Sequence, residues 1–521
     1  MLRTIRHNTA HNRQVGNAPT GTAPLRRPGA VALRDDGYRS GTAGRRYQRS
    51  GQTNGLKSVS HPLCRADENM RLRSYEDEIK RAFDNIVPTL KQISAIQHES
   101  DFETQAQRIA SEGMGFELPG EILTDAWVEQ LDMRRLFAWC VFYTYRRFCD
   151  EFFAADTQVG SATEDVDCLL QSCGFHTLDI SPCADGRLAH LVRYVLRLDP
   201  RAVRRKSYAG AMFDVEDSIQ KWMEIELQRF REGRPNTADA ATRYLKVAAY
   251  HYSSGDPEHE GCAAHGSDTD KAAQAALDRL TAFRQAIENS FCCGASIDIL
   301  LIGVDTDIDS IRIHIPDDNG QIELDCYVDT QTIYAETMRL DASASLRSID
   351  ASIRECSETV SDGMAKFIAR LVENNLSQID YVMANHGERY PDIGHAERFI
   401  GAGAGFEDIQ LRNLMYFAYL DTVEEGAADL DVGIKIFKGL NVSHGLPIPV
   451  VVRFDYHGDV PGARDRAEQR CGRVAQALSE RYEELYNQGL LHILQVARDC
   501  DGDGQLEIFA CSVNTIEAGG H

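Results

Sequence analysis

The chain lacks any run of about eighteen apolar residues, so we expect no membrane-spanning helix. No apolar segment follows the first arginines either, as a secretory signal would require. Cysteine is sparse as well: 14 residues in 521 are too few for a disulfide-stabilised scaffold, which favours reduced thiols in a bacterial or cytosolic protein. We therefore expect most of the cysteines to be small buried side chains and a few to bind metal.

Charge is unevenly distributed along the chain. The net charge is −23, yet residues 1–50 contain ten Arg against only Asp35 and Asp36, so this segment carries +8 and the remaining 471 residues carry −31. An acidic body of this kind repels phosphates, and we do not expect it to bind nucleic acid. Residues 1–60 are rich in Gly, Pro, Ser, Thr, Asn and Arg and almost free of periodic apolar residues, which predicts a disordered basic tail.

Several functions remain open for this tail. It would bind an acidic protein, bind nucleic acid or serve as an organelle transit peptide, which is also rich in arginine and poor in acids. A solvated segment without a partner is the remaining interpretation. Arginine pairs beside Leu25 and Tyr47 favour a protein partner, because such points can become ordered on binding.

Apolar patterns divide the rest of the chain into three predicted domains, and the chain as a whole is predicted to be α/β. Residues 61–155 show helical periodicity, with Ser74 as an N-cap and Pro88 as a break, and predict an all-α domain. Residues 156–395 alternate β runs with helices, which predicts an open, mainly parallel sheet with helices on both sides. Residues 396–521 predict a smaller α/β unit. Its expected strands are 432–437, 448–457 and 490–498.

Three potential metal ligands follow strands of the central domain. Cys183 comes directly after the strand predicted at 176–181, and His251 ends the strand predicted at 243–251. In open α/β sheets, ligands bind at the carboxyl ends of the strands. Cys262 is expected to open the next helix, where free N–H groups would stabilise its thiolate. The three residues predict a Cys₂His zinc site whose fourth position is open, which is typical of catalytic zinc.

The sequence around the first cysteine favours catalysis over a structural role. Cys183, Asp185 and Arg187 alternate in SPCADGRL, and Gly186 lets the backbone turn between them. A carboxylate two residues from a zinc thiolate can accept a hydrogen bond from zinc-bound water. The arginine can hold that carboxylate in a bidentate ion pair.

The histidine ligand has a competitor. His259 stands three residues before Cys262, so spacing alone permits it. It lies in the polar segment SSGDPEHEG, whereas His251 ends an apolar strand at the expected edge of the sheet. Position favours His251, and spacing leaves the choice open.

These motifs resemble the β-class carbonic anhydrases, in which Cys, His and Cys bind zinc beside an Asp–Arg pair. The segments CGFHTLDISPCADGRL, GCAAHGS, CCGASIDILLIGVDTD and DIGHAERFI resemble, more narrowly, the carboxysome shell carbonic anhydrase family of α-carboxysomes. Ten residues separate His251 from Cys262, more than in ordinary β-class enzymes. In the carboxysomal branch the more distant histidine is the ligand, which implies His251. The resemblance also implies that residues 396–521 are a degenerate copy of the catalytic domain.

The resemblance implies reversible hydration of CO₂ to bicarbonate, with one zinc ion per chain on Cys183, His251 and Cys262 and with Asp185 and Arg187 as the catalytic dyad. Zinc lowers the pKa of its bound water towards ~7, and the hydroxide attacks CO₂. The resemblance further implies a place on the inner side of the carboxysome shell, where bicarbonate dehydration supplies CO₂ to Rubisco. The basic tail would bind Rubisco. Shell proteins and a homodimer or higher homo-oligomer are the other implied partners.

Weaker alternatives accompany this interpretation. A scaffold or adaptor protein with a structural zinc would need a fourth protein ligand. A regulatory sugar phosphate, such as ribulose bisphosphate, has only the RAVRRK cluster (201–206) in its favour. The segment 499–504 resembles the start of a calcium-binding EF-hand loop, but its twelfth position is Ala510. We expect DTDIDS (305–310) to be a solvated turn.

Overall fold

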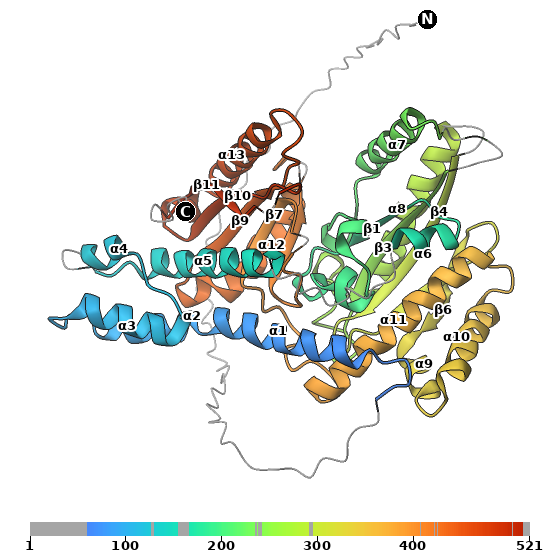
Figure 1. Cartoon of the computed structure of the whole chain (residues 1–521), viewed down its shortest axis with the longest axis horizontal. Coiled ribbons are helices and arrows are strands. Elements are labelled where there is room, and N and C mark those ends of the chain that lie inside the picture. The colour runs from blue at the N-terminus through green and yellow to red at the C-terminus, as the bar shows by residue number, and fades with distance from the viewer. Residues whose placement is uncertain are drawn as a thin grey trace, which may run out of the picture. The chain divides into compact units, whose positions relative to one another are not determined.

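The computed structural model describes most of the chain after the basic tail, and these residues belong to one unit. In that unit, helices cover two separate sheets (Figure 1). The predictions for the tail, apart from its last residue, lie outside the described residues. The described ranges are 60–126, 130–154, 166–234, 237, 242–290, 295–406, 408–420, 422–424, 426–502 and 504–513.

The first part of the described chain is entirely helical, as predicted. The expected N-cap at Ser74 is wrong, because the first helix already begins at Ala66 and Ser74 lies in its interior. The chain does break near Pro88, at Asn85, which places the proline in the first turn of a new helix, where no N–H donor is needed. The helices are α1 (Ala66–Asp84), α2 (Ile86–Ala95), α3 (Phe102–Met114), α4 (Gly120–Asp125) and α5 (Met133–Ala154).

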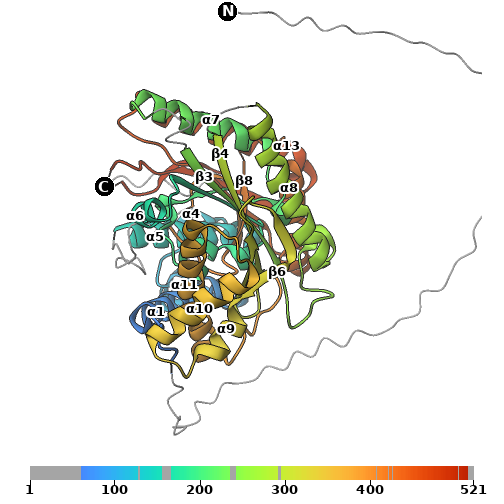
Figure 2. The ribbon, with the colours of Figure 1, turned by 90° about the vertical axis from the view of Figure 1, so that its right-hand side faces the viewer.

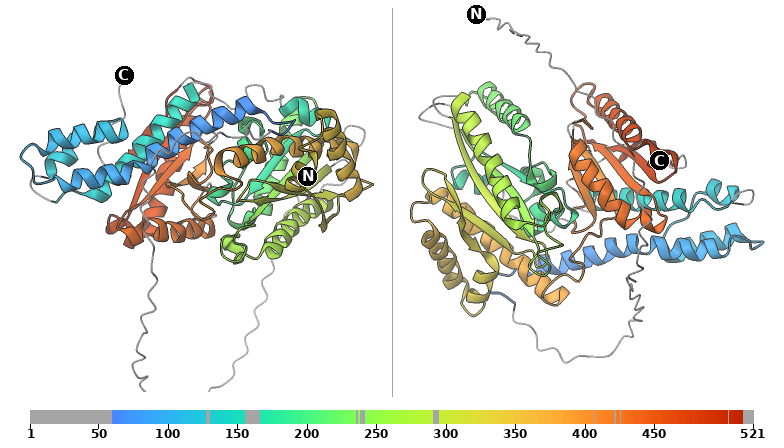
Figure 3. Two further views of the ribbon diagram at one scale, coloured as in Figure 1. Left: turned by 90° about the horizontal axis from the view of Figure 1, so that it is seen from below. Right: turned by 180° about the vertical axis from the view of Figure 1, so that it is seen from behind.

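These helices share a core with the C-terminal sheet. Phe142 and Tyr145 of α5 belong to the same buried cluster as Phe399, Val451 and Leu494, which lie on strands of that sheet. Figure 3 shows α5 lying along those strands. The all-helical part therefore serves as one covering layer of the C-terminal sheet.

The central part of the chain forms a six-stranded sheet in the order β2-β1-β3-β4-β5-β6. Strands β2, β1, β3 and β4 are parallel, as predicted, and β5 and β6 extend the sheet in antiparallel fashion. The strands are β1 (Thr177–Pro182), β2 (Arg204–Arg205), β3 (Thr242–Tyr252), β4 (Ala295–Asp305), β5 (Ile311–Pro316) and β6 (Ile322–Asp329).

Helices cover both faces of this sheet. Figure 2 shows α8 along one side of the β3–β4 pair and α11 on the other. The helices are α6 (Val166–Ser172), α7 (Val215–Arg231), α8 (Thr269–Ser290), α9 (Thr330–Thr337), α10 (Ala342–Cys356) and α11 (Asp362–His386). Short helical turns lie at η1 (Gly186–Leu188), η2 (Leu191–Val195), η3 (Pro200–Ala202), η4 (Ala209–Ala211) and η5 (Ala263–His265).

The turn between β4 and β5 is buried, so the expectation of a solvated turn at 305–310 is wrong. The carboxylates of Asp305, Asp307 and Asp309 are almost completely enclosed. Asp305 accepts the backbone N–H of Asp307 at 3.0 Å, and Asp309 accepts the phenolic O–H of Tyr390 at 2.8 Å. A carboxylate can be buried when internal donors replace the water that it loses.

The C-terminal part repeats the strand order of the central sheet. Its five strands run β11-β10-β9-β7-β8, with β8, β7, β9 and β10 parallel and β11 antiparallel. The same order and directions hold for β2, β1, β3, β4 and β5. This match supports a catalytic-like C-terminal domain. Its elements are β7 (Phe399–Ala404), β8 (Met415–Tyr419), α12 (Ala427–Leu440), η6 (Val442–His444), β9 (Ile448–Phe454), α13 (Ala463–Arg481), α14 (Glu483–Asn487), β10 (Leu491–Ala497) and β11 (Glu507–Cys511).

Two expectations about local structure are wrong here. Residues 432–437, expected as a strand, lie inside α12, because the buried residues Leu430, Ile434 and Phe437 follow helical spacing. A disulfide also joins Cys326 on β6 to Cys356 at the end of α10, where reduced thiols were expected. Among the described residues, no helix is both long and apolar enough to cross a membrane.

Helix α11 passes very close to the end of α6 at Gly363. A Cβ on Gly363 would lie 2.1 Å from the carbonyl oxygen of Cys173, so the main chain would have to move. We expect Gly363→Ala to lower the free energy of unfolding by about 1–3 kcal/mol. Denaturant titration measures this change.

Gly439, in the last turn of α12, is the matched control. A Cβ there meets no heavy atom within 4 Å. Gly439→Ala should leave the stability unchanged or raise it by up to about 1 kcal/mol, because alanine favours the helix. Equal stabilities of the two variants would contradict the close approach at Gly363.

Candidate metal centre

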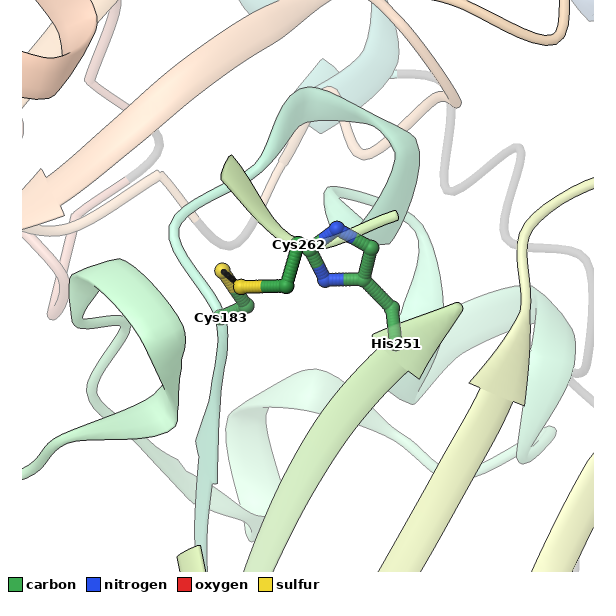
Figure 4. Close-up of side chains that lie close together, drawn as sticks. All are labelled: Cys183, His251 and Cys262. Atoms are coloured by element: carbon green, nitrogen blue, oxygen red, sulfur yellow. Dashed lines mark hydrogen bonds between the residues drawn. The ribbon is translucent and has the colours of Figure 1, made fainter. Parts of the chain in front are cut away.

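The parallel pairing of β1 and β3 brings the first two predicted ligands to one edge of the sheet. Pro182 lies opposite Ala249, and the N–H of Cys183 donates to the carbonyl of Ala249 at 3.0 Å. His251 lies in the last part of the neighbouring strand. Cys262 follows the next loop and precedes the short turn η5. The three side chains converge in Figure 4.

The geometry of these three side chains fits a zinc ion. Potential ligand atoms of Cys183, His251 and Cys262 all lie within 4.8 Å of one another, and the two sulfur atoms are 4.0 Å apart. Two Zn–S bonds of about 2.3 Å at a tetrahedral angle would place the sulfurs roughly 3.8 Å apart. All three residues are buried, and Nδ1 of His251 has no hydrogen-bond partner among the residues that the structure describes. Two thiols and an imidazole are a donor set that zinc prefers.

The competing histidine lies away from this group. The side chain of His259 is 73% exposed, and its Nδ1 lies 2.9 Å from Oδ1 of Asp256 in the polar loop. The group formed by Cys183, His251 and Cys262 contains no fourth Cys, His, Asp or Glu among the described residues. The structure thus brings His251, and not His259, to the two cysteines.

The two thiols are electrostatically different. The hydrogen bond between them raises the pKa of Cys183 well above its usual range and lowers that of Cys262. Burial raises the pKa of Cys262, but N–H groups at the start of η5, on Ala264 and His265, help to lower it. The N–H of Gly210 also donates to Sγ of Cys183, at 3.2 Å. The site thus supplies N–H donors to sulfur atoms, which suits thiolate ligands.

Asp185 and Arg187 form the predicted bidentate ion pair next to these ligands. Nε of Arg187 lies 3.0 Å from Oδ1 of Asp185, and Nη2 lies 2.8 Å from Oδ2. Burial opposes ionisation of Asp185, yet Arg187, His395 and His251 together outweigh it and hold the pKa of the carboxyl well below its usual range. Oδ2 of Asp185 is also 3.2 Å from Nε2 of His251. The carboxylate is therefore an ionised acceptor that borders the ligand group.

Arg187 also fixes the surrounding loops. Its Nη2 donates to the carbonyl of Gly261 at 3.3 Å, beside Cys262, and its Nη1 donates to the carbonyl of Ile393 at 3.0 Å. The guanidinium is completely buried. One side chain therefore connects the segment after β1, the loop after β3 and the segment that leads into the C-terminal sheet.

Two residues of the site were not predicted. Nδ1 of His395 lies 2.9 Å from Oε1 of Glu397, and its Nε2 lies 3.8 Å from Oδ2 of Asp185. Glu397 is buried and also accepts the N–H of Gly186 at 3.1 Å. Both residues lie in the segment DIGHAERFI, but no local pattern marks them as part of the site, because only the tertiary fold brings them to Asp185.

The C-terminal domain completes the small pocket at the site. Asn413 donates its N–H to the carbonyl of Gly186 at 2.8 Å, so the segment before β8 is bonded to the turn that carries Asp185. The pocket contains Cys183, Asp185, Cys262 and His395 on one side and the C-terminal residues Tyr416, Val432 and Ile436 on the other. This wall is largely apolar, which suits a small uncharged molecule.

The corresponding strand ends of the C-terminal sheet carry ion pairs instead of thiols. Arg453, near the end of β9, is buried and contacts Asp408 at 2.8 Å and Asp455 at 2.7 Å. No Cys–His group of metal-binding geometry occurs there among the described residues.

Comparisons with known proteins point to one family. Three sequence profiles of the carboxysome shell carbonic anhydrase match the chain, the N-terminal at 61–153, the catalytic at 165–395 and the C-terminal at 396–513. The chain is similar to the carboxysome shell carbonic anhydrase of Prochlorococcus marinus (strain MIT 9313), with 50% identity over 99% of both chains. It is also similar to that of Parasynechococcus marenigrum, with 54% identity over 93% of this chain and 84% of the relative. A third relative, from Halothiobacillus neapolitanus, is 46% identical over 84% of this chain and 87% of the relative.

The two histidines that competed as ligands give a matched pair of variants. We expect His251→Ala to purify with much less than one zinc per chain, because a buried ligand is lost. His259→Ala should retain the zinc content of the wild type, since this side chain is exposed and bonded elsewhere. Elemental analysis of the dialysed proteins measures both. Zinc loss in the second variant alone would reverse the assignment.

Proposed function

The chain belongs to the carboxysome shell carbonic anhydrase family, and we propose that it interconverts CO₂ and bicarbonate at a zinc ion held by Cys183, His251 and Cys262. The observation that carries this proposal is the convergence of two thiols and an imidazole beside a buried, ion-paired carboxylate. A structural zinc site has no use for such a carboxylate and is closed by a fourth ligand. These features support an enzyme over a scaffold or adaptor protein.

Zinc, when bound, would supply a water molecule whose pKa is lowered towards ~7. The protein's own part begins with Asp185, whose ionised carboxylate can accept a hydrogen bond and so orient the reacting oxygen. Arg187 holds both carboxylate oxygens through two N–H donors, which keeps Asp185 from turning onto the metal. The apolar wall from the C-terminal domain limits the access of further water to this pocket.

The family also suggests where and how the enzyme works. We propose that it resides in the carboxysome, on the inner side of the shell, and dehydrates bicarbonate to supply CO₂ to Rubisco. The basic segment 1–60 would bind the acidic surface of Rubisco, and the chain would contact shell proteins and form homodimers or higher homo-oligomers. We propose domain boundaries at 61–155, 156–395 and 396–521.

A regulatory sugar phosphate gains no support from the RAVRRK cluster. Lys206 forms an ion pair with Asp217, and Arg205 donates to the carbonyl of Ala189 at 2.9 Å. These two charges already have partners within the protein. We therefore do not extend the proposed function to regulation by ribulose bisphosphate.

Substitutions at Cys183 and Arg187 separate metal binding from turnover. Cys183→Ser should lose zinc and activity together, because a ligand is removed. Arg187→Ala should retain zinc but lower CO₂ hydration by about 10–100-fold, since Asp185 is no longer held. Stopped-flow hydration assays and zinc analysis measure the two effects, and thermal melting checks that each variant is folded. Normal turnover in Arg187→Ala would remove the Asp–Arg pair from the mechanism.

Deletion of residues 1–60 tests the role of the basic tail. The shortened protein should keep its zinc and its turnover, because the described site contains none of these residues. It should lose binding to Rubisco in pull-downs at low salt, whereas the full chain should bind and be released as the salt concentration rises. Unchanged binding of the shortened protein at low salt would rule out the tail as the tether.

A further inference from the structure

His395 and Glu397 form a hydrogen-bonded pair beside Asp185 that the proposed mechanism does not yet use. The pair lies between α11 and β7, at the junction of the catalytic and C-terminal domains. Together with Asp185 it forms a compact group, in which the two carboxylates are buried and the histidine is partly exposed. The side chain of His395 is 21% exposed and lies in the same pocket as Cys183 and Cys262.

The reaction needs a group that moves protons between this pocket and solvent. Hydration of CO₂ releases one proton for each bicarbonate formed, and dehydration consumes one. Asp185 is poorly suited to this task, because Arg187 occupies both of its oxygens. A proton carrier should instead reach both the pocket and the exterior and change its charge readily, which is a property of imidazole.

Glu397 prepares His395 for that task. Its Oε1 lies 2.9 Å from Nδ1 of His395, so in the neutral ring the proton belongs on Nδ1, where it is donated to the carboxylate. The lone pair of Nε2 then faces the pocket on the side of Asp185, 3.8 Å from Oδ2. Glu397 is itself fixed by the backbone N–H of Gly186. The tautomer and the orientation of the ring are thus both set by buried contacts.

We propose that His395 is the proton relay of this enzyme and that Glu397 is its positioning residue. The proposal rests on the proposed function and deepens it. In hydration, the Nε2 lone pair accepts the proton that the reaction releases. The imidazolium then gives the same proton from Nε2 to water or buffer, because Nδ1 stays bonded to Glu397. In dehydration, the imidazolium gives up the same proton from Nε2 and is recharged from solvent. No electron transfer or further reactant is needed.

The charges around the ring are consistent with this role. Burial disfavours the imidazolium and Arg187 opposes it, but Asp185 and Glu397 outweigh both and raise the pKa of His395 to about 9. The ring therefore carries a proton at neutral pH, ready for the dehydration direction.

The test compares His395→Ala and His395→Asn with the wild type. A relay acts after the interconversion of CO₂ and bicarbonate, so both variants should lose about tenfold or more in kcat while kcat/KM for CO₂ changes less than about twofold. Imidazole added to the assay should restore kcat in both. Zinc content should equal that of the wild type. His259→Ala, which changes an exposed histidine outside the pocket, should show no loss and no response to imidazole.

A readout independent of turnover examines the ring itself. In protein labelled with ¹⁵N at histidine, the signal that disappears in His395→Asn should show the Nδ1–H tautomer when the ring is neutral. Glu397→Gln should shift the titration of the His395 ring to lower pH. It should also reduce kcat less than removal of the imidazole does.

Clear results would overturn the proposal. Unchanged kcat in both His395 variants, or a parallel loss of kcat, kcat/KM and zinc without response to imidazole, would show that His395 is not the relay. Failure of the proposed function is a different result, since the wild-type protein itself would then contain no zinc or would not hydrate CO₂.

Discussion

The buried guanidinium of Arg187 is the contact on which the rest of the site depends. It neutralises Asp185, and it bonds to carbonyl groups of two segments that are distant in the sequence. One of those segments carries Cys262, and the other leads to His395. Removing one partner of a buried ion pair leaves an uncompensated charge, which costs about 3–5 kcal/mol. The same ion pair thus helps to hold the Asp185 carboxylate ionised and keeps the surrounding loops in place.

The second sheet also contains a buried arginine between carboxylates, but this arginine has a different role. Arg453 is buried between Asp408 and Asp455 at the strand ends that correspond to the metal site, and its Nη1 also donates to the hydroxyl of Tyr145 on α5 at 3.0 Å. This guanidinium therefore ties the helical N-terminal layer to the C-terminal sheet. In one sheet a buried arginine holds the carboxylate of the proposed catalytic site, and in the other it connects the sheet to the helical layer.

The sequence predicted those features that short-range patterns determine. Continuous apolar runs identified β3 and β4, and strand ends identified Cys183 and His251 as neighbours, because parallel strands end at one edge. The prediction for residues 432–437 was wrong because their apolar residues alternate as in a strand, whereas the residues that are buried follow helical spacing. The prediction for the aspartates at 305–309 was wrong because most of the donors that permit their burial lie in other segments, namely on Ser253, Ser254, Gly255 and Tyr390. His395 and Glu397 escaped notice for the same reason: their partners are set by tertiary contacts, and the disulfide between Cys326 and Cys356 equally depends on the fold.

The contribution of the C-terminal domain to the pocket has a consequence for how the enzyme responds to dilution. Tyr416, Val432 and Ile436 line one wall, and they reach the ligands through a covalent connection that begins a few residues before β7. A wall supplied by a separate subunit would be lost as the subunits dissociate, and activity per site would then depend on protein concentration. Within one chain the effective concentration of the wall is fixed by the linkage. Each pocket can therefore remain whole in a single molecule, even where few copies are present.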